Sequence, residues 1–394
     1  MKARFLALVL AAWGPACAGA ARVASTIGPP TAGAPTPGNP FAGARFFVNR
    51  DYVAKVESTI AIAPSRAVEL RKVEAYPTAV WLDSIESVAR VSRHLDDALA
   101  QQKATGEPVV AVFVLYDLPE RDCSAKASGG ELTAANGGED RYQAEYLDRI
   151  AAQLRAHPSQ RIVAIVEPDS LANIATNLAV AKCAGAEAIY RRSVARAVRT
   201  LSMPHVSLYL DAAHAGWLGW QSNRAKIAKI FHDVLTEAGG VDKIRGFATN
   251  VSNYDALRGG DIARLEPSDP CPDELTYVEK LSATLAEVGI TGKGFIIDTG
   301  RNGRSGTKTK SGSWCNLKGA GLGERPQASP VPGVDAYWWV KPPGDSDGAS
   351  EPSAPGYDDN CGPASPDSAP GAPAAGRWFA NYFLQLVENA VPPI

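Results

Sequence analysis

Residues 161–178 read RIVAIVEPDSLANIATNL and contain the parts of one β/α unit. The run Ile162–Val166 is short, apolar and rich in β-branched residues, as in a buried strand. It ends at Glu167 and Asp169, and a stretch that can form a helix begins at Ser170. In parallel sheets and barrels the carboxyl ends of the strands share one face. This stretch therefore predicts a strand that places acidic side chains on that face.

The same arrangement recurs along the chain, where apolar runs alternate with longer amphipathic stretches. The further runs are Thr78–Leu82, Val109–Leu115, Val206–Leu210, Gly246–Thr249, Gly294–Ile297 and Ala336–Val340. The helical candidates are Ser84–Gln102, Arg141–His157, Ala184–Leu201, Arg224–Ala238, Pro272–Val288 and Arg377–Asn389. Seven buried strands separated by helices predict an α/β fold built on a parallel sheet or barrel.

Polar residues follow every predicted strand, and most of them are acidic. A single aspartate at such a place is ordinarily a helix N-cap, which is the structural alternative for Asp169. Acids after at least five strands exceed what capping requires, so we expect a ligand site at the C-terminal strand ends. Besides Glu167 and Asp169, these residues are Asp83, Asp117, Asp211, Asn250, Asp298 and Lys341.

The composition limits the possible partners and compartments. With 394 residues and 45% hydrophobic content, the chain can form one large domain. A formal charge of −2 without basic runs argues against nucleic acid or an anionic membrane as a partner. Residues 1–20 have the three parts of a signal peptide and predict export. Residues 21–38 form a Pro- and Ala-rich lead-in, so we place the folded domain at residues 39–394.

Two long segments, 300–333 and 342–376, are rich in Gly, Pro and Ser and interrupt the alternation of strands and helices. Loops of this length inside a compact domain are usually functional lids or disordered inserts. Cys315 lies in the first loop and Cys361 in the second, and a bridge between them would hold both over the rim. Cys17 leaves with the signal peptide, and five cysteines remain. Export favours structural disulfides with one leftover thiol.

Carboxyl groups that lie close together are the requirement for hydrolysing a glycosidic bond, since one donates a proton and the other stabilises charge or assists water. Asp122 and Asp169 follow neighbouring strands and meet this requirement. A nearby carboxylate disfavours ionisation, so one of the two would keep its proton to a higher pH. Asp169 is the expected donor.

Aromatic rings stack on sugar rings, and amphipathic tryptophan suits a wet groove. The candidates are Trp81, Trp217, Trp220 and Trp314. A buried pair is the alternative for Trp217 and Trp220, but the neighbouring glycines, Asp211 and His214 favour exposed platforms. Trp338 and Trp339 lie inside an apolar strand, and at least one should be in the core.

Other chemistries leave no signature. The chain lacks G-x-S-x-G, G-x-x-x-x-G-K-[ST] and G-x-G-x-x-G sequences, and His214 is the only histidine at a strand end. Neither C-x-x-C nor H-E-x-x-H occurs, so we expect no metal and no cofactor. Asn250 begins the only N-x-[ST] sequon, and its place at a strand end predicts contact with substrate rather than a glycan.

Several longer motifs, in order from about Asn39 to the C-terminus, resemble glycoside hydrolase family 6. They are YDLPERDCSA (116–125), RIVAIVEPDSLANIATNL (161–178), YLDAAHAGWLGW (209–220), GFATNVSNY (246–254), DTGRNG (298–303), SWCN (313–316) and WVKPPGDSDG (339–348). The resemblance implies an inverting cellulase on a distorted seven-stranded parallel β/α barrel. It would cut β-1,4-glucan by a single displacement, with its active site at the C-terminal strand ends.

The resemblance also implies roles for individual residues. Asp169 resembles the general acid, Asp122 the aspartate that raises the pKa of this acid, and Asp347 the catalytic base. Tyr116 resembles the tyrosine that distorts the sugar ring, and Ser128 the loop serine that orders water. The residues that resemble sugar-contacting or charge-network positions are Asp211, His214, Asn250, Arg301, Lys341 and Asp345, the last where many relatives carry Glu.

The disulfides that the resemblance implies are Cys123–Cys183 and Cys315–Cys361, with Cys271 left over. Both lid segments, 122–140 and 342–376, have full length. This favours a tunnel-forming cellobiohydrolase that releases cellobiose from non-reducing ends of cellulose. An open-cleft endoglucanase of the same family and a non-catalytic glucan-binding barrel remain as alternatives, and a monomer is expected.

Overall fold

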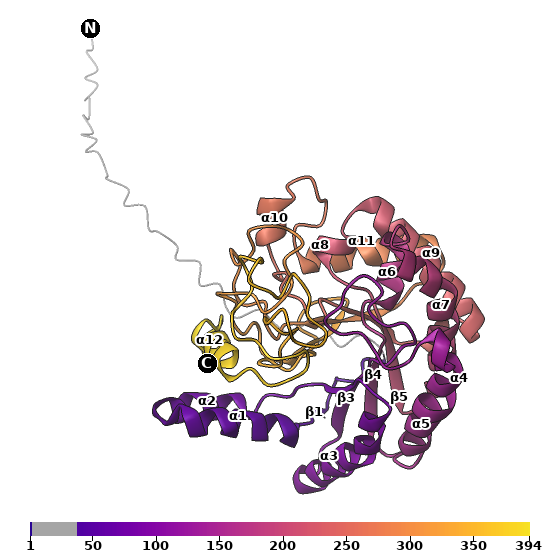
Figure 1. Ribbon diagram of the computed structural model, residues 1–394, viewed down its shortest axis with the longest axis horizontal. Helices are drawn as coiled ribbons and strands as arrows, with labels where there is room; N and C mark the ends of the chain where they lie inside the picture. Colours follow the sequence, from indigo (N-terminus) through magenta and orange to yellow (C-terminus); the bar gives the residue numbers. More distant parts are fainter. Residues whose placement is uncertain (2–37) are drawn as a thin grey trace. The chain divides into compact units, whose positions relative to one another are not determined.

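The predicted strands form one sheet in the computed structural model, which describes Met1 and residues 38–394 (Figure 1). Its strand order is β1-β3-β4-β5-β6-β7-β9-β8, and β2 pairs with β3 beside that path. The strands are β1 (Arg45–Phe46), β2 (Val80–Leu82), β3 (Val109–Leu115), β4 (Arg161–Val166), β5 (Val206–Asp211), β6 (Gly246–Thr249), β7 (Gly294–Asp298), β8 (Gln327–Ala328) and β9 (Val334–Trp338).

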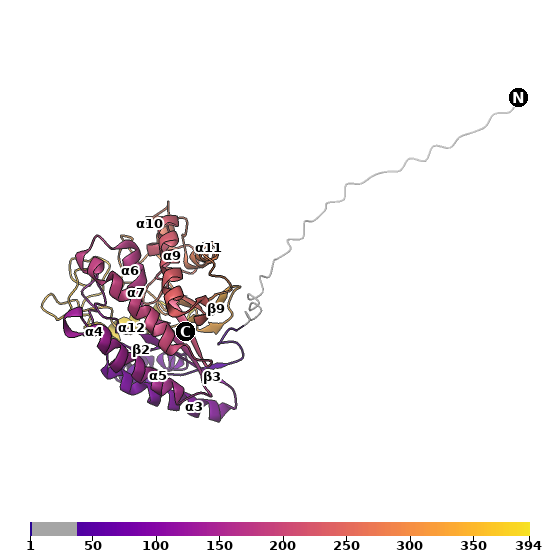
Figure 2. The ribbon, with the colours of Figure 1, turned by 90° about the vertical axis from the view of Figure 1, so that its right-hand side faces the viewer.

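Helices follow the strands as in repeated β/α units. They are α1 (Arg50–Ile62), α2 (Ala67–Val73), α3 (Val91–Thr105), α4 (Gly138–Arg141), α5 (Asp148–Arg155), α6 (Ser170–Thr176), α7 (Ala181–Leu201), α8 (Ala215–Leu218), α9 (Gln221–Ala238), α10 (Asp261–Leu265), α11 (Glu274–Glu287) and α12 (Ala380–Glu388). Helices α3, α5, α7 and α9 lie along one side of the strands in both views (Figures 1 and 2).

The seven predicted strands are all present and pair in parallel, so the predicted fold class is confirmed. Between β2 and β9 the ladder is reduced to a single parallel bridge from Thr78 to Trp339. One bridge in place of a full ladder makes the barrel distorted. Sequence patterning did not predict β1 or the antiparallel β8, which have two residues each, nor helices α1 and α2.

The strands are recognisable in the sequence because both of their faces are buried. In β3, Val110, Val112 and Val114 pack into the barrel interior, whereas Ala111 and Phe113 pack against the outer helices. A parallel strand covered on both faces reads as a continuous apolar run. Trp338 and Trp339 are both fully buried, as predicted for at least one of them.

The two long segments, 300–333 and 342–376, have little regular structure. The first contains the short strand β8, and no helix lies among the described residues of either. Disulfides join Cys123 to Cys183 and Cys315 to Cys361, and Cys271 is a buried free thiol. Both predicted bridges are therefore confirmed. The predicted signal peptide and lead-in lie outside the described residues. Within the described part of the chain, no helix is long and apolar enough to cross a membrane.

Candidate active site

Three adjoining cavities lie along the C-terminal strand ends and form one elongated cleft. The central cavity, about 220 Å³, shares Trp81, Tyr116, Ser128 and Lys341 with a neighbour of about 310 Å³. On its other side it shares His214, Trp217, Asn253 and Trp314 with a third, more open cavity. The cleft thus has a central part, an end that contains Asp345 and an end lined by tryptophans.

All five residues predicted to be catalytic line the central cavity, namely Tyr116, Asp122, Ser128, Asp169 and Asp347. Among the predicted substrate-binding residues, Trp81, His214, Trp217, Trp314 and Lys341 line it as well. Asp83 and Asp345 line the neighbour of about 310 Å³, and Trp220 lines the tryptophan end. The fold therefore brings residues from positions 81 to 347 into one cleft.

Asp169 occupies the N-cap position of α6, but its side chain makes no capping hydrogen bond. Its φ is 67°, in the left-handed region that non-glycine residues seldom adopt. Asp122, Ala213 and Asn250 at the same rim also have positive φ. Such strain clusters at functional sites, where the surrounding structure maintains it. The N-cap alternative for Asp169 is wrong, and its carboxyl group is left free to face the cleft.

The surroundings of Asp169 favour its protonated form. Burial and the charges of Asp211 and Asp122 raise the pKa of Asp169 well above its ordinary value, while Lys341 opposes this. Asp211 lies directly behind it, because one Asp211 carboxylate oxygen (Oδ2) accepts the Asp169 backbone N–H at 3.0 Å. Burial also raises the pKa of Asp211, to about 7. Neighbouring carboxyls titrate as a coupled set, so protons are retained near neutral pH.

Tyr116 and Asp122 form the wall beside this acid. The Tyr116 hydroxyl donates to Asp122 Oδ2 at 3.2 Å, and burial raises the pKa of the Asp122 carboxyl. The Arg121 guanidinium lies 4.2 Å from the centre of the Tyr116 ring. It also donates to the backbone carbonyls of Ser128, at 2.7 Å, and Asp83, at 3.0 Å. Arg121 therefore connects the loop that carries Ser128 to the cleft wall.

Asp347 has the opposite environment. Burial alone would raise its pKa, but the charges of Arg301 and Lys341 hold it below the ordinary value. Arg301 Nη1 lies 2.7 and 2.8 Å from the two carboxylate oxygens. The Tyr254 hydroxyl and the Asn316 N–H donate to Oδ2 at 2.8 and 2.9 Å. Asp347 is thus held as a carboxylate.

Asp345 lies at one end of the cleft and is paired with a residue from α1. Lys55 Nζ lies 2.6 Å from Asp345 Oδ1, and both side chains line the cavity. Trp81 lies nearby and is half-buried, with its indole N–H donating to the Val340 carbonyl at 2.9 Å. This end therefore combines an aromatic face with an ion pair.

The other end is lined by half-buried tryptophans. Trp217 and Trp314 border both the central and the outer cavity, and Trp220 borders the outer one. The Trp217 indole N–H donates to the Thr176 hydroxyl at 2.8 Å, which fixes its ring. Trp217 and Trp220 are therefore not a core pair but partly exposed cleft residues.

Three residues predicted to bind substrate lie behind the cleft instead. Asn250 is fully buried, and its side-chain amide forms hydrogen bonds with the backbone of Asp255 and Asp298. These bonds shape the loop after β6. Arg301 is 1% exposed and pairs with Asp347, and Asp211 is 4% exposed and supports Asp169. The prediction that Asn250 touches substrate is wrong, and the other two belong to the charge network.

The two predicted lids meet each other. The Lys126 N–H, in the loop after β3, donates to Asp358 Oδ2 in the 342–376 loop at 3.0 Å. At Gly348 a Cβ atom would come within 2.9 Å of the Ala127 Cβ and 2.6 Å of Cys361 Sγ, so the contact there is tight. Residues of both loops line the cavity that contains Asp345. The two loops therefore contact each other and both border this end of the cleft.

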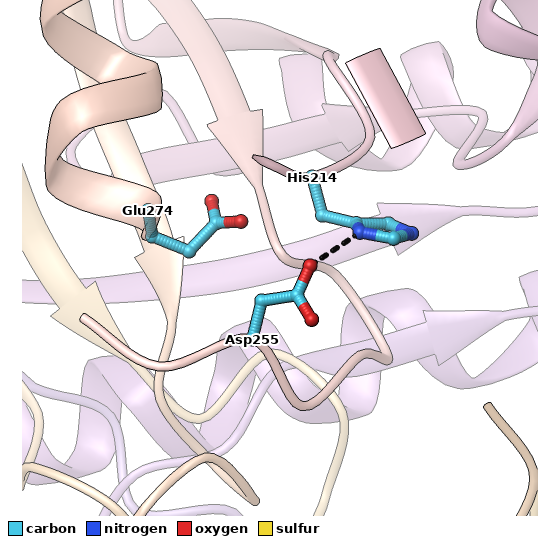
Figure 3. Close-up of side chains that lie close together, drawn as sticks. All are labelled: His214, Asp255 and Glu274. Carbon is cyan, nitrogen blue, oxygen red and sulfur yellow. Dashed lines mark hydrogen bonds and ion pairs between the residues drawn. The ribbon is translucent and has the colours of Figure 1, made fainter. Parts of the chain in front are cut away.

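One cluster has the donor set of a cation site. His214, Asp255 and Glu274 offer ligand atoms within 4.8 Å of one another (Figure 3). However, Lys308 Nζ lies 2.7 Å from Asp255 Oδ1 and supplies the positive charge. Burial and the charge of Asp255 raise the pKa of Glu274 well above its ordinary value, so it holds a proton. The cluster is thus neutralised by protein groups, and the expectation of no metal stays a prediction.

Sequence reasoning missed several residues that support the cleft, among them Lys55, Arg121, Tyr254 and Asp255. Their partners are distant in sequence or are backbone groups, as with Lys55 and Asp345, which are 290 residues apart. Tyr254 and Arg121 lie inside the motifs that carry the family resemblance, and this is the signal in the sequence that could have identified them.

A carboxyl group that favours its protonated form, a carboxylate and aromatic rings in one cleft are what a glycoside hydrolase requires. The family model for glycosyl hydrolases family 6 matches residues 41–390, and this chain belongs to that family. Its resemblance to the family is therefore confirmed.

Curated relatives carry names of both exo- and endo-acting enzymes. Exoglucanase 3 of Agaricus bisporus is 41% identical over 345 residues, covering 87% of this chain and 76% of the relative. The 1,4-beta-D-glucan cellobiohydrolase C of Emericella nidulans is 40% identical over 359 residues, covering 88% and 77%. A Fusarium oxysporum relative named as an endoglucanase type B is 40% identical over 333 residues, covering 84% and 71%.

A solved structure agrees in fold. Cellobiohydrolase II (Cel6A) from Humicola insolens, in complex with glucose and cellotetraose, superposes with a TM-score of 0.86 at 39% identity. The match covers 91% of this chain and all of that one.

Proposed function

We propose that this protein hydrolyses the β-1,4-glucosidic bonds of cellulose with inversion and releases cellobiose from non-reducing chain ends. The observation that carries the proposal is one cleft holding two differently tuned carboxyl groups. Asp169 is free of capping bonds and keeps its proton, and Asp347 is held as a carboxylate. Half-buried tryptophans flank both.

In the proposed reaction Asp169 gives its proton to the glycosidic oxygen as the bond from that oxygen to C1 breaks. A water molecule forms the new bond to C1 from the opposite face, and its proton passes toward Asp347. Inverting enzymes hold the two carboxyl groups roughly 6.5–9.5 Å apart to admit this water. We propose that this proton passes through a second water, which would donate to an Asp347 oxygen beside the bonds from Arg301 and Tyr254.

Tyr116, Asp122 and Ser128 complete the proposed machinery. Tyr116 presents its buried ring beside Asp169 and presses on the sugar at the reacting bond. Asp122 adds negative charge that keeps the proton on Asp169. Ser128 lies where the central cavity joins the cavity that contains Asp345, and it can hold a water there.

The exo-acting mode is favoured by the contact between the two loops. A closed roof admits a chain end and excludes internal segments, whereas an open cleft would bind chains anywhere. Replacing Asp358 by Ala removes the Lys126 hydrogen bond, which is worth about 0.5–1.5 kcal/mol and changes the open fraction about two- to tenfold. We expect more loss of viscosity per reducing end formed on a soluble cellulose derivative.

The exposed neighbour Asp359, changed to Ala, is the matched control. If wild type already thins the solution rapidly per bond cut, the open-cleft endoglucanase is the better description. If Asp358→Ala leaves the ratio unchanged, this contact does not control access.

The remaining proposals concern the setting of the enzyme. The N-terminal pattern supports export, and the disulfides suit an oxidising compartment. The near-neutral charge supports action on cellulose and cello-oligosaccharides, without nucleic acid or membrane partners. We propose that the protein acts as a monomer.

A further inference from the structure

His214 lines both the central cavity and the tryptophan end of the cleft. Its Nδ1 lies 2.6 Å from Asp255 Oδ2, as the dashed line in Figure 3 marks. A carboxylate can only accept a hydrogen bond from this nitrogen, so Nδ1 carries the hydrogen and the ring orientation is fixed. The other nitrogen, Nε2, is then the atom available to a sugar hydroxyl.

Asp255 is itself held from several sides. It is 3% exposed, and its Oδ2 also accepts the Gly216 N–H at 3.0 Å. Its backbone N–H and carbonyl are bonded to the Asn250 side chain. The free oxygen Oδ1 accepts from Lys308 Nζ at 2.7 Å. Every polar group of Asp255 therefore has a partner. Asp255 acts at the cleft through the residues that it holds there, namely His214, Gly216 and Lys308.

Lys308 brings a distant segment into this arrangement. It is 5% exposed, an unusual state for a lysine, and it belongs to the 300–333 loop that also supplies Trp314. Trp314 lines the same end of the cleft as His214 and Trp217. The buried ion pair therefore connects the loop with Trp314 to the strand end with His214.

We propose that Lys308 and Asp255 are positioning residues that set the affinity of the tryptophan end of the cleft for glucose units, by fixing His214 and the loop of Trp314. This rests on the proposed function, since the ligand is a β-1,4-glucan chain. Shorter ligands that do not reach this end would not sense the pair.

The test measures binding in an Asp169→Asn background, so that no ligand is consumed. Tryptophan fluorescence gives the dissociation constants of cellotriose and cellohexaose for the parent, Lys308→Met and Asp255→Asn. The ratio of the cellotriose to the cellohexaose dissociation constant gives the affinity gained on lengthening the ligand. We expect this ratio to fall about tenfold in both variants, as for the loss of a charge-supported hydrogen bond. Lys308→Arg should restore most of it, and Lys310→Met, on the exposed part of the same loop, should have no effect.

A double-mutant cycle separates positioning from general loosening of the fold. Lys308→Met should cause less loss in a His214→Ala background than it causes alone, because the part of its effect that passes through His214 is already gone. The proposal fails if the two losses add fully, if both ligands weaken equally, or if the gain on lengthening is unchanged. Absence of turnover in the wild type, with the binding pattern as expected, would refute the proposed hydrolase and leave the positioning role in place.

Discussion

Asp169 and Asp347 line the same cavity, yet their surroundings drive their pKa values in opposite directions. Asp169 has carboxyl neighbours and no hydrogen bond to its carboxyl group among residues 38–394, whereas Asp347 has a guanidinium, an ammonium, a hydroxyl and an N–H around it. Both are buried enough for neighbours to matter more than solvent. The neighbours therefore decide which carboxyl group gives a proton and which stays charged.

The largest expected effect comes from removing the acid. Asp169→Asn keeps the shape but has no proton to give, so kcat on cello-oligosaccharides should fall about 10²–10⁴-fold with binding nearly intact. Release of soluble sugar from amorphous cellulose and fluorescence titration measure the two quantities. Wild-type activity retained in the variant would end the assignment of Asp169, and no turnover in the wild type would favour a binding protein.

The next effect concerns the partner that keeps Asp347 charged. Arg301→Met leaves a buried carboxylate with fewer partners, and we expect the free energy of unfolding to fall by about 3–5 kcal/mol. Urea unfolding measures it. Lys229→Met breaks an exposed pair with Asp233 and should cost at most about 0.5 kcal/mol.

This difference has a defined dependence on pH. The folded-state pKa of Asp347 is lowered, so its stabilisation is present above the ordinary value of about 4 and is lost as pH falls through the folded value. The difference in free energy of unfolding between the wild type and Arg301→Met should therefore become smaller at acidic pH. A gap that stays constant between neutral and acidic pH would show that Arg301 acts by packing instead.

The smallest effect is a shift in the pH profile. Asp211→Asn removes one of the charges that raise the pKa of Asp169, so the acid loses its proton at lower pH. The alkaline limb of kcat/KM should move down by about one pH unit or less. Asp83→Asn, in the neighbouring cavity, is the control, and the alkaline limb of its kcat/KM profile should not move. Movement of the limb to higher pH would contradict this account of Asp169.

The seven barrel strands and most of the helices were predictable, because burial on both faces gives continuous apolar runs between amphipathic stretches. The two-residue strands β1 and β8 have no such pattern. Residues at strand ends were found because parallel strands bring them to one face, but that rule does not say which of them reach the cleft. Asn250 shows this, since its amide satisfies buried backbone groups instead.

By itself the sequence determined the fold class, the face that carries the site and the residues that supply acids and aromatic rings, since these follow from periodicity and motif. The folded structure is needed to show that Asp211 supports Asp169, that Arg301 and Lys341 keep Asp347 charged, and that Lys126 contacts Asp358. The reason is that pKa values and lid contacts depend on distances between groups remote in the chain, which a local pattern does not contain.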